Sequence, residues 1–160
     1  MRFVLVDRFL SVEPGRSATA LKTFSPEDPV FADHFPGLPV VPGVLLTEAM
    51  GQAAGWALAA GLAPDRFPVL LMIEQAKFRR LVKPGEEIRL EAEIEPARGD
   101  TCSARTRARV AGDRVAEARL VFHVLPVPES TPAFEAWRAR VLDETELGGL
   151  LGQTGVGPAR

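Results

Sequence analysis

The feature that most constrains this chain is a helix-length segment built largely from small residues, at positions 43–60. Pro42 and Gly43 open the segment, and Gly61 and Pro64 follow it, which predicts a helix between them. Small side chains recur on nearly every side of this helix, at Ala49, Gly51, Ala53, Ala54, Gly55, Ala57, Ala59 and Ala60. Each interior glycine destabilises an isolated helix by roughly 1 kcal/mol. We therefore expect another backbone to pack very close to this helix, and the rest of the domain to wrap around it.

Short strand patterns flank the predicted helix in the sequence. Two β-like runs precede it, at residues 3–10 and 17–24, and the Pro14-Gly15 pair between them indicates a hairpin turn. Five further strands are predicted after it, at residues 69–74, 76–82, 88–95, 101–110 and 114–125. Hairpin turns between consecutive strands indicate an antiparallel sheet. One long helix with such a sheet predicts an α+β domain.

The composition changes after residue 126. A linker comes first, marked by Pro126, Pro128 and Pro132. A short amphipathic helix is predicted at residues 133–147, and a glycine-rich tail that we expect to be flexible follows at residues 148–160. A length of 160 residues suits one domain with its own core. The sequence thus predicts a single domain over residues 1–126 and an appendage over residues 127–160.

Charge and cysteine content exclude several function classes. A formal net charge of -2 rules out a strongly basic nucleic-acid binder. The single cysteine, Cys102, rules out an internal disulfide framework and a cysteine-rich zinc site, and two histidines argue against a histidine-cluster metal site. The apolar stretch 40–62 contains Glu48 and Gln52, which argues against a membrane span. Because the first residues lack the apolar stretch of a signal peptide, we expect a cytoplasmic protein.

His34 is a candidate for acid–base chemistry because of the loop that carries it. Residues 33–43 contain three prolines and two glycines, a composition that excludes regular helix or strand but can hold a chain in one irregular shape. A loop histidine is more often structural or simply exposed than catalytic. The residues alone leave both interpretations open.

Glu48 is the second candidate. It lies in the second turn of the predicted helix, among Leu45, Leu46, Ala49 and Met50, where the helix has almost no polar face. A carboxylate there is either paired or has a raised pKa, as a general acid near neutral pH requires. Gln52, one turn further on, is placed to hydrogen-bond it. The plainer interpretation is a solvated glutamate favoured by the helix dipole.

A nineteen-residue segment resembles the active-site signature of the bacterial 3-hydroxyacyl-(acyl carrier protein) dehydratases: HFPGLPVVPGVLLTEAMGQ, residues 34–52. The resemblance extends over about residues 1–125 and includes LVDR at 5–8, FRR at 78–80 and VKPGE at 82–86. His34 and Glu48 are both in register with the family's catalytic pair. The dehydratase-isomerase branch of the family carries aspartate at the position of Glu48, so the glutamate favours dehydration without isomerisation.

The resemblance implies the hot-dog fold, an antiparallel sheet wrapped around one long central helix. It also implies removal of water from a 3-hydroxyacyl thioester. Neutral His34 would take the proton from C2 and protonated Glu48 would protonate the leaving hydroxyl, while the N–H of Gly43 would stabilise the thioester carbonyl. Gln52 would support Glu48. Such chemistry needs no metal and no organic cofactor.

The resemblance further implies a homo-oligomer, either a dimer or a trimer of dimers. In the family the histidine of one subunit faces the carboxylate of the other, so a monomer would be inactive. An apolar tunnel beside the helix takes the acyl chain, and its end depends on the packing of four aromatic residues, Trp56, Phe67, Phe78 and Phe122.

Substrate would arrive on the phosphopantetheine arm of an acidic acyl carrier protein. The basic docking candidates that the family match covers are Lys77, Arg79, Arg80 and Lys83. A second basic stripe, formed by Arg105, Arg107 and Arg109, alternates with small residues, and we favour a solvated sheet face over a docking role for it. We expect His123 to be a packed structural residue and Cys102 to be unreactive.

The sequence departs from the family pattern at three places, and the first two leave the pathway open. The chain starts almost within the first predicted strand, residues 127–160 extend beyond the usual end, and Gly51 stands where alanine is more usual. A specialised dehydratase of polyketide or polyene lipid synthesis is one alternative to fatty-acid synthesis. A hot-dog acyl thioesterase and a non-catalytic subunit that binds the acyl carrier are the others, although the intact pair of His34 and Glu48 argues against both.

Overall fold

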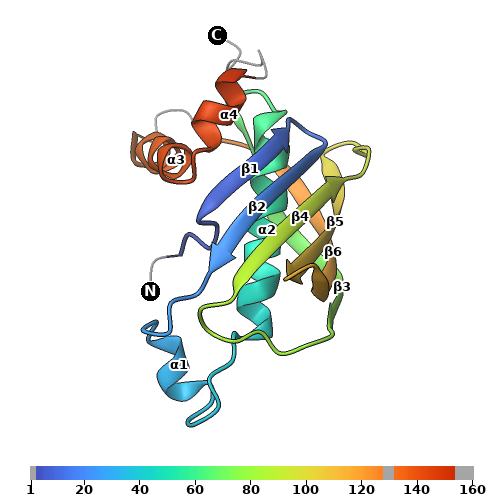
Figure 1. Cartoon of the computed structure of the whole chain (residues 1–160). Helices are drawn as coiled ribbons and strands as arrows, with labels where there is room; N and C mark the ends of the chain where they lie inside the picture. The colour runs from blue at the N-terminus through green and yellow to red at the C-terminus, as the bar shows by residue number, and fades with distance from the viewer. Residues whose placement is uncertain (1–2, 128–131, 154–160) are drawn as a thin grey trace.

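The computed structural model describes residues 3–127 and 132–153. Its elements are β1 (Arg8–Glu13), β2 (Ser17–Thr23), α1 (Val30–Asp33), α2 (Gly43–Ala60), β3 (Arg66–Phe78), β4 (Glu87–Ile94), β5 (Thr101–Val110), β6 (Asp113–Pro126), α3 (Pro132–Glu144) and α4 (Leu147–Gln153). The strands form one antiparallel sheet in the order β1-β2-β4-β5-β6-β3. The sheet curves around α2 (Figure 1). This is the α+β arrangement that the sequence predicts, with the long helix enclosed by the sheet.

Helix α2 is buried on most of its circumference. Ala49, Ala53 and Ala57 are fully buried, and larger residues such as Leu46 and Trp56 complete its contacts with the strands. Small side chains bring the helix axis close to the sheet, because the distance between packed elements depends on the side chains between them. Across the described ranges, no helix combines the length and the apolar character that crossing a bilayer requires.

The close backbone approach expected at the interior glycines is found elsewhere. A Cβ atom added at Gly51 or Gly55 would lie 3.7 Å from a side-chain carbon of the sheet, an ordinary contact distance. At Gly61, just after α2, an added Cβ would lie only 2.6 Å from the backbone nitrogen of Gly15 in the β1–β2 turn. The N–H of Gly15 also donates to the carbonyl of Ala57 at 2.8 Å. The expectation for Gly51 and Gly55 is therefore wrong, and Gly61 is the position where two backbones meet.

Two strand predictions need correction. The first strand begins at Arg8 rather than at residue 3, because residues 3–7 cross α2 as irregular chain. The two strands predicted at 69–74 and 76–82 are one strand, β3, which ends at Phe78. Irregularities in its register with β6, between Leu70 and Met72 and between Ile73 and Gln75, interrupt the alternation that the sequence shows without breaking the strand.

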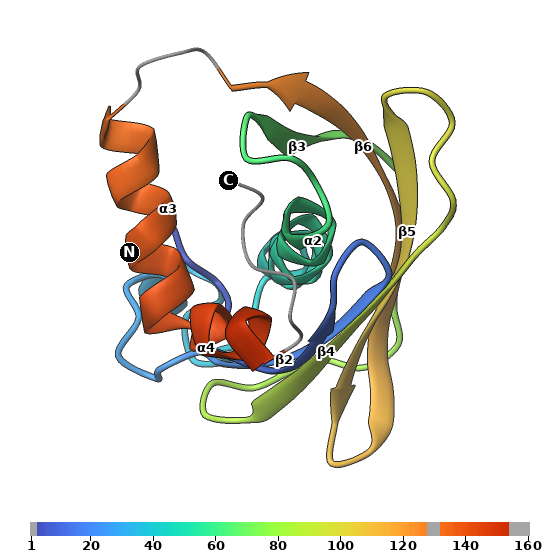
Figure 2. The same ribbon diagram turned by 90° about the horizontal axis from the view of Figure 1, so that it is seen from above.

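Residues 132–153 pack onto the domain as two helices. Figure 2 shows α3 and α4 on the side of α2 that the sheet leaves open. Val141, Thr145 and Leu147 are almost fully buried, and the N–H of Phe9 in β1 donates to the carbonyl of Thr145 at 2.9 Å. These contacts place the extension in the same hydrophobic core as the strands.

The extension differs from the sequence prediction in its second half. The single helix predicted at 133–147 ends at Glu144, and Leu147 begins a second helix instead of ending the first. The flexible tail predicted from residue 148 is wrong for residues 148–153, which belong to α4, because Leu150 and Leu151 pack against the core. Residues 128–131 of the predicted linker and 154–160 of the predicted tail lie outside the described residues.

Replacing Leu147 by alanine tests whether the extension shares the core. Because Leu147 is fully buried, we expect Leu147→Ala to lower the free energy of unfolding by about 2–5 kcal/mol in urea denaturation. Arg140→Ala on α3 is the control, since Arg140 is exposed and its pairing with Glu144 is worth less than about 1 kcal/mol. Equal stabilities for the two variants would contradict the shared core.

Candidate active site

His34 lies directly after α1, where the loop turns toward α2. Its Nδ1 is 3.2 Å from the carbonyl oxygen of Val40, and its backbone carbonyl accepts from the N–H of Val40. Phe35 stacks on the imidazole with the ring centroids 4.2 Å apart. A carbonyl oxygen can only accept, so the contact with Val40 requires the hydrogen on Nδ1. In the neutral ring, Nε2 therefore carries the lone pair that can accept a proton.

Glu48 is held by its neighbour one turn along α2. The Nε2 of Gln52 donates to Oε1 of Glu48 at 3.0 Å. The same amide reaches the N-terminal segment, where its Oε1 accepts from the N–H of Leu5 at 2.7 Å and its Nε2 donates to the carbonyl of Phe3 at 3.3 Å. The N–H of Leu5 decides which way the amide faces. Gln52 thus ties the carboxyl group to the chain segment that crosses α2.

The two oxygens of the Glu48 carboxyl group differ in their surroundings. Oε1 accepts from Gln52, whereas Oε2 has no hydrogen-bond partner among residues 3–127 and 132–153. An amide N–H can only donate, so a proton on a neutral Glu48 belongs on Oε2. The geometry leaves that oxygen available to a substrate.

A pocket of about 230 Å³ begins at Glu48 and runs along α2. Its helical wall consists of residues three or four positions apart, which share one face of a helix: Glu48, Gly51, Gln52, Gly55 and Trp56. Residues of β3 and β6 form the facing wall: Phe67, Pro68, Val69, Leu70 and Phe122. The two glycines leave room between these walls, since each lines the pocket without a side chain. Apart from Glu48 and Gln52 the lining is apolar, which suits a hydrocarbon chain.

Gly43 lies at the start of α2, where the first N–H groups have no partner within the helix. The ring of Phe78, at the end of β3, covers its α-carbon, since a Cβ added to Gly43 would lie only 2.9 Å from the ring. Of the four aromatic residues predicted to determine the end of the tunnel, three line the pocket: Trp56, Phe67 and Phe122. Phe78 lies at the opposite end of β3 from Phe67 and does not line it.

The structure brings some of the predicted site residues together and keeps others apart. Glu48 and Gln52 share the pocket, and Gly43 begins the helix that carries both. His34 is not among the residues that line this pocket in a single chain. One copy of the described chain therefore presents the carboxylic acid at the pocket without the histidine.

The four basic docking candidates lie around the start of α2. Lys77 and Arg79 flank Phe78, which packs against Gly43. The segment after β3, which carries Arg80 and Lys83, is joined to the loop before α2 by a hydrogen bond from the N–H of Val41 to the carbonyl of Val82. This set, Lys77, Arg79, Arg80 and Lys83, is called the basic cluster below.

Two members of the basic cluster are already engaged by carboxylates. The Arg79 guanidinium lowers the pKa of Glu117 through a hydrogen bond. The backbone N–H of Lys83, followed by the Arg80 guanidinium, lowers the pKa of Glu86. Lys77 and Lys83 have no carboxylate oxygen within 4 Å of the ammonium group among the described residues. The charge of Lys77 also lowers the pKa of Glu117 and that of Lys83 lowers the pKa of Glu86, so each lysine lies near a carboxylate without a direct ion pair to it.

The second basic stripe is a paired sheet face. Arg105, Arg107 and Arg109 of β5 each form an ion pair with a glutamate of the neighbouring strand β4 or its end: Glu95, Glu93 and Glu91, respectively. The residues between the arginines point into the core, as the alternation predicts. Partners on the adjacent strand explain these arginines without an external ligand.

Cys102 and His123 belong to the sheet rather than to the pocket. Burial raises the pKa of the Cys102 thiol, which leaves little reactive thiolate at neutral pH. His123 lies on β6 between Val69 of β3 and Thr101 of β5. Throughout residues 3–127 and 132–153, no three histidine, cysteine or carboxylate side chains gather as metal ligands.

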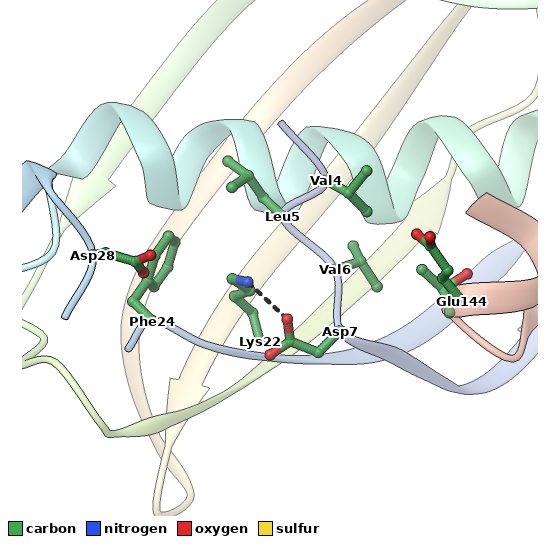
Figure 3. A pocket seen from close by; sticks show the side chains of 9 residues that line it. Val4, Leu5, Val6, Asp7, Lys22, Phe24, Asp28 and Glu144 are labelled. Carbon is green, nitrogen blue, oxygen red and sulfur yellow. Dashed lines mark hydrogen bonds and ion pairs between the residues drawn. The ribbon is translucent and has the colours of Figure 1, made fainter. Parts of the chain in front are cut away.

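A second pocket lies on the other side of the N-terminal segment. Figure 3 shows Val4 and Leu5 against α2, the ion pair between Lys22 and Asp7 at 2.7 Å, and Glu144 reaching in from α3. Asp28 adds a further charge to the lining. Charged groups on several sides make this pocket unsuited to an acyl chain. It also contains none of the predicted site residues.

Sequence reasoning missed two parts of the site. The N-terminal segment, with Phe3 and Leu5, sets the orientation of Gln52 from 47 or more positions away. The contact between Phe78 and Gly43 joins the last residue of β3 to the first residue of α2. No local pattern signals either contact, because both depend on how β3 and the N-terminal segment lie against α2.

Comparison with known proteins identifies relatives of this chain. The model of the FabA-like domain matches residues 1–119. A 3-hydroxyacyl-[acyl-carrier-protein] dehydratase FabZ of Pelotomaculum thermopropionicum is 46% identical over 125 residues, covering 76% of this chain and 88% of the relative. The protein of the same name from Symbiobacterium thermophilum is 40% identical over 134 residues, covering 82% and 93%.

Solved structures support the fold independently. A thioesterase superfamily member from Thermus thermophilus superposes with a TM-score of 0.62 at 22% identity, covering 86% of this chain and 98% of the other. The fluoroacetyl-CoA thioesterase FlK gives a TM-score of 0.60 at 22% identity, covering 84% and 98%. At such identities the likeness concerns the hot-dog fold alone. The match over residues 1–119 and the FabZ relatives show that the chain belongs to the FabA-like family.

Proposed function

We propose that this protein dehydrates 3-hydroxyacyl thioesters carried by an acyl carrier protein, in fatty-acid or related lipid synthesis. The observation that carries the proposal is a carboxylic acid held by Gln52 at the polar end of an otherwise apolar pocket. The identity to FabZ relatives over most of the chain supports the same reaction. Because Glu48 is a glutamate, the proposal is dehydration without isomerisation.

In the proposed reaction His34 acts at C2 and Glu48 acts at C3 of the substrate. His34 Nε2 takes a proton from C2, and the electron pair of that C–H bond forms the C2–C3 double bond. The C3–O bond breaks as Oε2 of protonated Glu48 gives its proton to the leaving hydroxyl, which departs as water. Transfer of a proton from His34 back to Glu48 restores the starting state. The hydrogen bond from Nδ1 to Val40 supports the tautomer that this step needs.

The thioester carbonyl gains negative charge as the C2 proton leaves. The N–H of Gly43 is one of the donors at the start of α2 that have no partner within the helix, where the helix dipole favours negative charge. A preorganised N–H of this kind stabilises a developing oxyanion. We assign Gly43 that role, with Gln52 as the residue that positions Glu48.

A second copy of the chain completes the proposed site. Strand β3 is an edge strand of 13 residues, and Leu71, Met72 and Ile73 on it are about half or more exposed. A long exposed apolar edge is an aggregation hazard unless it is covered. We propose that β3 pairs with β3 of a second copy, which would bring His34 of the other copy to the pocket beside β3. A dimer is then the smallest active unit.

The basic cluster is the proposed docking surface for the carrier protein. It lies beside Gly43, at the end of the pocket where the thioester must sit. Among the described residues Lys77 and Lys83 form no direct ion pair, so their ammonium groups can turn toward an acidic partner, whereas the arginines of β5 are paired across the sheet. Opposite charge at this position would steer the carrier and present the phosphopantetheine arm to the pocket.

The acid–base pair is tested by turnover of a 3-hydroxyacyl pantetheine thioester, with enoyl absorbance and thiol release followed in the same sample. We expect enoyl product from the wild type, and a loss of at least about 100-fold in kcat for His34→Ala and for Glu48→Gln. Enoyl formation that survives in both variants would contradict the assignment. Thiol release without enoyl product would favour a thioesterase, and neither product from carrier-bound substrate would favour a binding subunit.

Mixing the two inactive variants tests the shared site in the same assay. If each site takes His34 from one copy and Glu48 from the other, a mixed dimer has one site with both wild-type residues and one site with neither. Random mixing makes about half of the dimers mixed, so about a quarter of wild-type activity returns. Subunits must first be exchanged under mild denaturation and reassociation. A site contained within one chain predicts no recovery, and each variant mixed with itself is the control.

The role of the Gly43 N–H is tested by comparing two substitutions. Proline is tolerated at the first helical position because its φ suits a helix, and it removes the N–H. Alanine keeps the N–H but meets the Phe78 ring just as proline does. We expect kcat of Gly43→Pro to be about 100-fold or more below that of Gly43→Ala. Equal rates would remove Gly43 from carbonyl binding.

Charge reversal tests the docking surface. Lys77→Glu and Lys83→Glu should each raise KM for the carrier-bound substrate roughly tenfold at low salt, and high salt should reduce the difference. The KM for the pantetheine thioester alone should not change. Arg105→Glu, on the paired face of the sheet, is the matched control. A rise in KM with both substrates would mean that the lysines act on the pocket and not on the carrier.

A further inference from the structure

The acyl pocket has two ends that differ in what closes them. Glu48 is at one end and Trp56 at the other, eight residues along α2 and therefore about 12 Å away. Strand β3 runs alongside in the opposite sense, since its last residue, Phe78, meets Gly43 and its second residue, Phe67, meets Trp56. A chain attached at the thioester end thus points toward Trp56 and Phe67.

Two aromatic residues of α3 stand behind that end. The centroid of the Trp137 ring is 5.5 Å from that of Trp56, and the centroid of the Phe134 ring is 5.2 Å from that of Phe67. Phe134 and Trp137 are themselves 5.5 Å apart, and Phe67 meets Trp56 edge-on at 5.9 Å. Trp56 and Phe67 are therefore shared between the pocket lining and a four-ring cluster with α3.

Helix α3 is fastened where it meets these rings. Arg138, next to Trp137, donates to the carbonyl of Pro64 in the α2–β3 connection at 3.2 Å. Further along, Val141 is buried in the core. Figure 2 shows α3 beside α2, opposite the curved sheet. Two contacts thus fix the position of α3: Arg138 holds it to the connection that leads into β3, and Val141 anchors it in the core.

We propose that α3 sets the depth of the acyl pocket, with Trp137 and Phe134 as residues that determine chain length. This inference rests on the proposed function, since it concerns the acyl chain of the same substrate. The rings of α3 prevent Trp56 and Phe67 from turning away from the pocket, so the pocket ends at these side chains. Short and medium acyl chains fit, and a long chain meets the ring cluster. Removal of Trp137 leaves space into which the Trp56 ring can turn, which lengthens the pocket.

The experiment compares chain lengths in the full-length protein. kcat/KM is measured with 3-hydroxybutanoyl, 3-hydroxyoctanoyl and 3-hydroxyhexadecanoyl pantetheine for the wild type, Trp137→Ala, Trp137→Leu and Phe134→Leu. We expect the ratio of the longest to the shortest substrate to rise roughly tenfold in Trp137→Ala, because small changes in an apolar pocket discriminate chain lengths by such factors. The leucine variants keep an apolar side chain at each position, so they are expected to stay folded even if the alanine variant does not. Thermal melting of every variant checks that it is folded. Arg140→Ala, on the same helix and exposed, should leave the ratio unchanged.

Binding of unreactive thioesters separates this inference from the proposed function. The affinities of butanoyl and hexadecanoyl pantetheine are measured by calorimetry for the same variants. A shift in affinity toward the longer chain in the Trp137 variants supports the inference. If neither the wild type nor any variant forms enoyl product, only the proposed dehydratase activity is refuted, and the binding result still stands. Unchanged ratios in folded variants, in turnover or in binding, would overturn the role of α3.

Discussion

Enclosure of α2 by the curved sheet is the constraint on which the other features of this protein depend. The helix is enclosed through small side chains such as Ala49, Ala53 and Ala57, which leave little distance between its axis and the strands. A helix held this way has few positions free to face a ligand, so the pocket lies along the stripe of the helix that contains the two interior glycines. That stripe runs from Glu48 to Trp56 and contains Gly51 and Gly55.

The pocket explains why α2 contains two interior glycines. Gly51 and Gly55 are unfavourable in a helix by roughly 1 kcal/mol each relative to alanine. Their neighbours across the gap are side chains at ordinary contact distance, so no backbone requires them. What they preserve is the width of the pocket. Gly61, which the helix pattern marks only as an end signal, is the position where the β1–β2 turn touches the helix.

Helices α3 and α4 add a second layer to an arrangement that is otherwise a sheet around a helix. They contribute Val141 and Leu147 to the core and Phe134 and Trp137 to the aromatic cluster. Strand β3 remains the uncovered edge, and it also forms one wall of the pocket. The two boundaries of the pocket therefore have different origins. One lies at Trp56 and Phe67, which contact the aromatic rings of α3, and the other is β3, the edge strand that we propose a second copy covers.

The sequence by itself determined the class of fold, the enclosed helix, most strands and the pairing of Glu48 with Gln52. Each rests on local periodicity, turn residues or a spacing of four along a helix, which act over short stretches of chain. Only the tertiary structure decided that residues 3–7 cross α2, that β3 is continuous, and that Gly148 lies in a helix. It also decided that His34 does not line its own chain's pocket. These features depend on contacts between residues far apart in the sequence, whose energies leave no pattern in neighbouring residues.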